Sequence, residues 1–228
     1  MPLVYDIDND CAKQCMATSL AVRQALSPPR ISTYLHALQD RPPSLDKALE
    51  LYVWNGQLGA ALLTPISICE VVFRNAVDDA LTALHGQNWP WVQGFYLSLP
   101  QRGREALIEA RNKPSSISTG KVIAELSFGF WENMFKASFD AALWTPYLAT
   151  VLPNLAMPVY VGRGHVHAEL IKLRKLRNRI AHHEPLLTLN AQQTMNDIQA
   201  LIALRCQDTA AWMAQSNNLT ALLAARPR

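Results

Sequence analysis

The chain has 228 residues, half of them hydrophobic, so one large or two small folded domains with a real core are expected. Its net charge of +3 is too mild to predict a partner. Residues 1–10 are acidic and contain no apolar segment, so we expect no signal peptide. The longest apolar run, Gly59–Ile68, is interrupted by Thr64-Pro65, well short of the ~20 residues that a membrane-spanning helix needs. We therefore expect a cytoplasmic protein without a membrane partner.

The cysteines and histidines do not predict a metal site. No pair of cysteines has the spacing of a zinc site: Cys11, Cys15, Cys69 and Cys206. His165 and His167 begin a helical pattern, where residues i and i+2 face apart. We expect reduced, mostly buried thiols and no metal or other cofactor.

The hydrophobic periodicity is helical nearly throughout, which predicts an all-α fold. We expect one all-helical domain over residues 1–228, with a weak possible subdivision near 88–100. The predicted helices cover residues 10–26, 31–39, 45–63, 65–85, 101–112, 120–135, 137–147, 165–182, 191–212 and part of 214–228. Ser44 is predicted as an N-cap and Gly86 as a C-cap, while Pro65 kinks the path or begins a new helix. Residues 88–100 are predicted to be a loop with aromatic anchors, and 146–164 a connector.

The most informative segment is residues 177–185, with the sequence RNRIAHHEP. Four residues separate Arg177 from His182, and Pro185 disfavours helical geometry at Glu184. His182 is therefore predicted in the last turn of a helix, where the negative end of the helix dipole favours a cation. Arginine can hold a phosphate bidentately, and histidine can move a proton near neutral pH.

This combination suits RNA cleavage without a metal, with the 2′-hydroxyl as the nucleophile. Arg177 would stabilise the extra charge of a pentacoordinate phosphate, and His182 would act as general acid or base. Asn178 would fix an imidazole tautomer or contact the same phosphate, and His183 is an alternative to His182. The structural alternative is that arginine and histidine only cap the helix, with His183 and Glu184 as a surface pair.

A basic run leads to this segment, opposed within it only by Glu169. We predict that these side chains contact RNA phosphates: Arg163, Lys172, Arg174, Lys175 and Arg179. One stripe of the same helix is predicted to be buried: Val166, Leu170, Leu173 and Leu176. Arg174, Asn178 and His182 would share another face.

Two further segments stand out. Glu70, Arg74 and Asn75 lie in very apolar surroundings, so we expect a partly buried ion pair. It would either brace the helix of Arg177 or take part in the site. Residues 125–135, with the sequence ELSFGFWENMF, carry an aromatic stripe at helical spacing that we interpret as core rather than as an RNA-stacking surface.

Four segments together resemble the Abi-like (abortive infection) family of the HEPN superfamily. They are residues 27–35 (S-x-x-R-x-x-x-Y-L), 70–75 (E-x-x-x-R-N), 125–135 (L-x-F-G-x-W) and 177–185 (R-N-x-x-A-H-H). The resemblance implies a HEPN-like helical bundle with additional helices. It also implies a metal-independent endoribonuclease in which Arg177 and His182 are catalytic and Asn178 is their polar companion. It also implies a homodimer with one composite cleft, acting in phage defence or as a toxin, with an antitoxin that is a protein or an RNA.

Two alternatives stay open at this point. The chain could be a catalytically inactive RNA- or nucleotide-binding regulatory module of the same fold. It could also be a structural interaction protein in which Arg177 and His182 only cap a helix. The sequence does not name the RNA target.

Overall fold

The computed structural model describes residues 7–38, 42–113 and 117–227, with side chains described from residue 16 onward. Within these ranges the chain forms twelve α-helices and no strand, which confirms the all-α fold class. In chain order they are α1 (Ile7–Leu26), α2 (Pro28–Ala37), α3 (Leu45–His85), α4 (Gln93–Ser98), α5 (Gln101–Asn112), α6 (Thr119–Glu125), α7 (Phe128–Met134), α8 (Thr145–Val151), α9 (Val159–Ala181), α10 (Ala191–Arg205), α11 (Gln207–Gln215) and α12 (Leu219–Ala224). Three short turns join them: a 3₁₀ turn at Trp89–Trp91, another at Ala137–Phe139 and a π turn at Asp140–Trp144.

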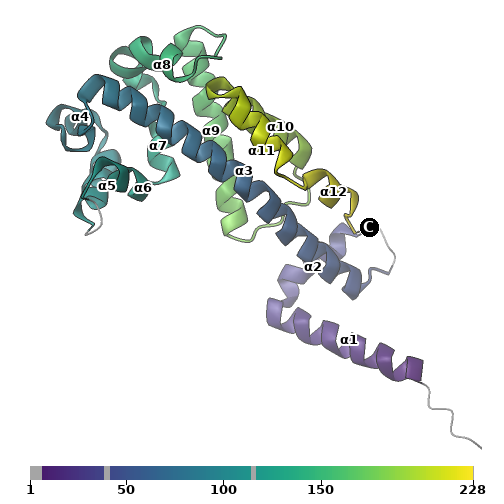
Figure 1. Cartoon of the computed structure of the whole chain (residues 1–228). Helices are drawn as coiled ribbons and strands as arrows, with labels where there is room; N and C mark the ends of the chain where they lie inside the picture. Colours follow the sequence, from purple (N-terminus) through teal and green to yellow (C-terminus); the bar gives the residue numbers. More distant parts are fainter. Residues whose placement is uncertain (1–6, 39–41, 114–116, 228) are drawn as a thin grey trace, which may run out of the picture.

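Helix α3 is the spine of the molecule (Figure 1). It spans 41 residues and contacts helices from both halves of the chain, including α2, α7, α9, α10 and α12. The Ser44 side chain accepts a hydrogen bond from the Lys47 N–H at 3.4 Å, and Gly86 ends the helix with a φ of 83°. Both predicted caps are therefore confirmed.

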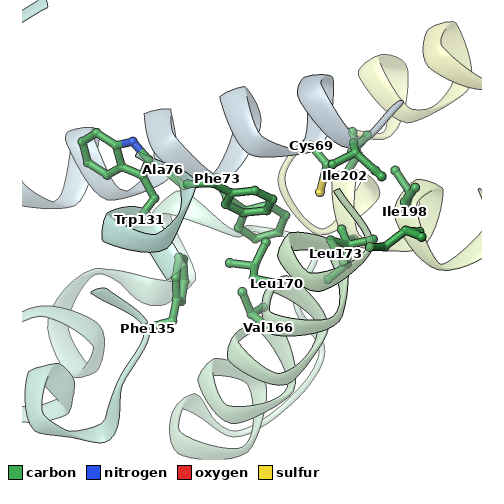
Figure 2. Packing of buried hydrophobic residues seen from close by; sticks show 14 of the residues in the cluster. Cys69, Phe73, Ala76, Trp131, Phe135, Val166, Leu170, Leu173, Ile198 and Ile202 are labelled. Carbon is green, nitrogen blue, oxygen red and sulfur yellow. The ribbon is translucent and has the colours of Figure 1, made fainter. Parts of the chain in front are cut away.

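The centre of the core lies where α3 crosses α7, α9 and α10 (Figure 2). Phe73 on α3 meets Phe135 edge-to-face at a ring-centroid distance of 5.8 Å, and Phe135 stacks on Trp144 at 4.4 Å. The predicted stripe on α9 and the aromatic side chains of residues 128–135 are all buried, which confirms both as core. Burying each such side chain contributes about 1.5–3 kcal/mol.

Pro65 neither ends α3 nor starts a new helix, contrary to the prediction of a break near it. A proline inside a helix removes a backbone hydrogen bond and costs about 3 kcal/mol. One continuous buried stripe offsets that cost on both sides of Pro65: Leu58, Leu62, Ile66, Cys69 and Phe73. Both halves of α3 are thus held on the same core, and tertiary packing overrides the local preference.

Several other boundaries also differ from the prediction. Residues 88–100 are not a plain loop but contain a 3₁₀ turn and α4, anchored by Trp89, whose Nε1 donates to Asp78 Oδ1 at 2.7 Å. The predicted helix 120–135 is two helices, because the Ser127 hydroxyl accepts from the Phe130 N–H at 3.3 Å and starts α7. The predicted helix 191–212 is broken at Cys206, whose Sγ accepts from the Thr209 N–H at 3.4 Å.

The remaining differences are shifts of helix ends. The predicted helix 137–147 is a pair of tight turns followed by α8, and α9 begins at Val159, so the connector shrinks to residues 152–158. The helix at 101–112 is confirmed. Gln39 and the side chains of Cys11 and Cys15 lie outside the described residues, whereas Cys69 and Cys206 are free thiols.

In the described ranges, α3 is the one helix that is long and apolar enough to span a membrane. Its length was not expected, because Pro65 was predicted to interrupt the apolar run. Of its most apolar window, 44% is buried inside the protein. The core helix of a soluble protein meets the same test of length and composition, so the cytoplasmic location stays a prediction.

The end of α9 is fastened to the middle of α3. Gly59 leaves room there, since a Cβ at this position would lie 3.2 Å from Ile180 Cγ2 and 3.8 Å from Leu186 Cδ1. One turn away, Asn55 is only 7% exposed, and its Oδ1 accepts a hydrogen bond from the Leu186 N–H at 2.6 Å. The segment that follows α9 is therefore held on α3 by packing and by one buried hydrogen bond.

We expect Asn55→Ala to lower the free energy of unfolding by about 1–3 kcal/mol, because it leaves the buried Leu186 N–H without an acceptor. Urea denaturation followed by circular dichroism measures this. Gln57→Ala, an exposed amide on the same helix, is the matched control and should change stability by less than about 0.5 kcal/mol. Equal effects of the two substitutions would contradict a special role for Asn55.

Candidate catalytic site at the end of helix α9

Helix α9 ends in a Schellman motif, which is formed by residues of the predicted catalytic segment 177–185. The His183 N–H donates to the Ile180 carbonyl at 3.0 Å, and the Glu184 N–H donates to the Arg179 carbonyl at 2.9 Å. His183 takes the left-handed position of this motif, with a φ of 55°. His182 is the residue just after the helix, whose last residue is Ala181, and does not lie inside the last turn as predicted.

The side chains of the predicted catalytic residues lie at this exposed end. Arg177, His182 and His183 are exposed, and Asn178 is half-buried. Arg177 Nη1 donates to Asn178 Oδ1 at 3.4 Å, so these two polar groups are adjacent. Five residues of helix rise, about 7.5 Å, separate Arg177 from His182 along the axis. No hydrogen bond joins the two side chains in the described part of the chain, and both are open to a ligand.

Side chains from other residues bind the backbone of residues 183–186. These contacts do not use the imidazoles of His182 and His183. Arg30 on α2 donates from Nη1 to the His183 carbonyl at 3.0 Å. Arg179 Nη2 donates to the Pro185 carbonyl at 2.8 Å, and its Nε lies 3.4 Å from Glu184 Oε2. No pattern in the sequence indicated a role for Arg30 or Asn55. Arg30 does lie in the 27–35 segment that carries the family resemblance, and this was the one signal that could have found it.

The structure brings Glu70 and Arg74 on α3 close to Arg177. Burial raises the pKa of Glu70, and the nearby charges of Arg177 and then Arg74 oppose that shift. Arg74 is half-buried, and its Nε has no hydrogen-bond partner among the described residues. Glu70 and Arg74 are both half-buried as expected, but no ion pair joins them in the described ranges, and a role as brace or site member stays a prediction. Asn75 is exposed on the same helix.

Most of the predicted RNA-binding cations have partners inside the chain. Arg163 Nε lies 2.8 Å from Asp140 Oδ1, and Lys172 Nζ lies 2.6 Å from Glu169 Oε1. Arg174 pairs with Glu132, a carboxylate on α7 whose residue is 4% exposed. Among the residues predicted to contact RNA, Lys175 forms no ion pair in the described ranges. Arg163 also lies about 21 Å from Arg177 along α9, by helix rise.

The described side chains include no group of three or more His, Cys, Asp or Glu that could hold a metal ion. The chain matches no protein-family model, no curated protein and no solved structure. The candidate site therefore rests on its own residues and their geometry.

We expect His183→Gly to raise the free energy of unfolding by up to about 1 kcal/mol, because a residue with a side chain is strained at a positive φ and glycine is not. The hydrogen bond from Arg30 to the backbone carbonyl is retained. Ala181→Gly, two residues earlier in helical conformation, is the control with the opposite sign, a loss of up to about 1 kcal/mol. Thermal and urea unfolding compare the two. A loss of stability in His183→Gly would show that the imidazole makes a contact worth more than the strain.

We expect the stability of the wild type, relative to Glu70→Gln, to fall as pH rises from about 4 to about 7. Because burial raises the pKa of Glu70, the native state binds this proton more tightly than the unfolded state does. The contribution of the protonated Glu70 carboxyl to the free energy of unfolding is therefore present at low pH and is lost as the carboxyl ionises. Urea titrations across this range measure it, and parallel stability curves for the two proteins would contradict it.

Proposed function

We propose that this protein is a metal-independent endoribonuclease of the HEPN type, with Arg177 and His182 as its catalytic pair. One observation carries the proposal. Arg177 and His182 present an exposed guanidinium and an exposed imidazole at one helix end, while four neighbouring cations on α9 form ion pairs. A cation and a titratable group held next to solvent by a fixed backbone are suited to bind and cleave a phosphodiester.

In the proposed reaction the 2′-hydroxyl attacks the adjacent phosphorus, and the bond from phosphorus to the 5′-oxygen breaks. The products are a 2′,3′-cyclic phosphate and a 5′-hydroxyl. Arg177 holds the phosphate and stabilises the pentacoordinate transition state. His182 moves a proton, either from the 2′-hydroxyl or to the leaving 5′-oxygen. Asn178, which accepts a hydrogen bond from Arg177, orients the guanidinium.

The reaction needs one proton removed and one delivered, which two imidazoles do most easily. A homodimer that joins two such helix ends would provide them, and this motivates the proposed dimeric composite site. RNA is the proposed substrate. The proposed setting is phage defence or a toxin–antitoxin pair in the cytoplasm, with an antitoxin of protein or RNA.

The second candidate is an RNA- or nucleotide-binding regulatory module of the same fold without catalysis. The exposed Arg177 guanidinium beside Asn178 favours this candidate, because it is enough to hold a phosphate, whereas no hydrogen bond among the described residues orients the His182 imidazole for proton transfer. Binding without cleavage is its signature.

We expect the purified wild type to cleave RNA in EDTA and to leave 2′,3′-cyclic phosphate ends. His182→Ala should slow cleavage by about 10²–10⁴-fold, and Arg177→Ala by about 10²–10³-fold. Lys175→Ala, which removes an exposed cation two residues from Arg177, is the control for charge alone and should lose less than about tenfold. His183→Gly retains the backbone conformation. Its cleavage rate, compared with that of His182→Ala, shows which of the two histidines is needed for cleavage.

Circular dichroism and thermal unfolding establish that each variant is folded. Equal cleavage by all proteins would place the activity elsewhere or in a contaminant, and would overturn the assignment. RNA binding that needs Arg177, without cleavage by any protein at micromolar concentration, would replace the nuclease with the regulatory module.

A further inference from the structure

A cavity of about 600 Å³ lies between the start of α5 and α7, away from the end of α9. None of its lining residues belongs to α9. This volume is within the usual range for small-molecule sites, roughly 300–1,000 Å³. The cavity therefore has room for a ligand of its own.

The lining combines an apolar floor with two cations. Leu99, Phe130 and Phe139 supply apolar surface, and Arg102 and Lys136 stand at the cavity as exposed charged side chains. No acidic residue lines it. Asn133 Nδ2 donates to the Gly129 carbonyl at 2.6 Å, so the amide is fixed in place and its oxygen is left as an acceptor.

The two cations at the cavity have no acidic partner in the described ranges, and several other cations of the protein share this property. Six other arginines and lysines form ion pairs in the described ranges: Lys113, Arg163, Lys172, Arg174, Arg179 and Arg205. Arg102 and Lys136 form none there, although the fold places both beside one cavity. Two unpaired cations and no carboxylate favour an anion at this position.

The rim of the cavity is formed before any ligand arrives. Arg104 donates from Nε to the Leu99 carbonyl at 2.7 Å and from Nη2 to the Leu97 carbonyl at 3.3 Å, which fixes the turn between α4 and α5. On the other side, α7 is held by the pair between Glu132 and Arg174. Binding here would therefore require little reorganisation.

We propose that this cavity binds a small organic anion, with its apolar body against the lining that includes Leu99, Phe130 and Phe139 and its charged group at Arg102 and Lys136. A mononucleotide and an aromatic carboxylate share this chemistry. This site does not depend on the proposed RNA cleavage, and each of the two proposals can be tested without the other.

The test uses 8-anilinonaphthalene-1-sulfonate as an anionic probe and N-phenyl-1-naphthylamine as its uncharged counterpart, each titrated by fluorescence. We expect the double variant Arg102→Glu/Lys136→Glu to weaken the sulfonate at least about tenfold while leaving the uncharged probe within about twofold. Lys121→Glu, an exposed lysine outside the cavity, is the matched charge control and should leave both probes unchanged.

A second variant tests the cavity itself. Ala106 lines it, and Ala106→Phe should fill it and weaken both probes while the two cations remain. Arg177→Ala should bind both probes like the wild type, which separates this site from the nuclease proposal. Displacement of the sulfonate by AMP would identify a nucleotide ligand, and displacement by 1-naphthoate alone would identify an aromatic carboxylate. Equal loss in Lys121→Glu, unchanged binding in Ala106→Phe, or failure of both competitors would overturn the proposal.

Discussion

The packing of α9 on the middle of α3 is the contact on which the candidate site depends. Gly59 lets Ile180 approach closely, and Asn55 satisfies the buried N–H of Leu186. Without that approach, the segment after α9 would lose its buried attachment to α3, the helix that carries Glu70 and Arg74. A site made of exposed side chains needs such a backbone, because precise placement of reacting groups comes from the buried elements that carry them.

The left-handed conformation of His183 is a local cost that the fold retains. Glycine is the usual residue at this position of a Schellman motif, since it avoids the strain of a positive φ. Histidine there is held by two backbone hydrogen bonds of the motif and by Arg30 from α2. Strain of this kind collects at functional segments, where surrounding contacts over-determine the backbone. The same geometry turns the chain sharply, so that His182 leaves the helix axis and faces solvent.

Local rules predicted the parts of the fold that depend on neighbours in sequence. The caps at Ser44 and Gly86 and the buried stripe of α9 follow from short-range patterns. Pro65 was misjudged because the apolar stripe that keeps α3 whole is a tertiary effect. The ion pairs were likewise invisible: Asp140 and Glu132, which neutralise Arg163 and Arg174, are 23 and 42 residues away in sequence. A count of charges along one helix could not show which of them the fold had already used.

That pairing changes what the net charge of +3 means. The basic run of α9, taken linearly, suggests one long phosphate-binding face. In three dimensions Arg163 and Arg174 pair with carboxylates on other elements, and Lys172 pairs with Glu169 on α9 itself. The cations left without ion pairs include Lys175 and Arg177 near one end of α9 and Arg102 and Lys136 beside the cavity at α5 and α7. Because paired charges largely cancel at a distance, the outward positive field comes mainly from unpaired cations, and these four are among them. The two proposed anion sites are therefore separate, with the neutral pair of Arg174 and Glu132 between α9 and α7.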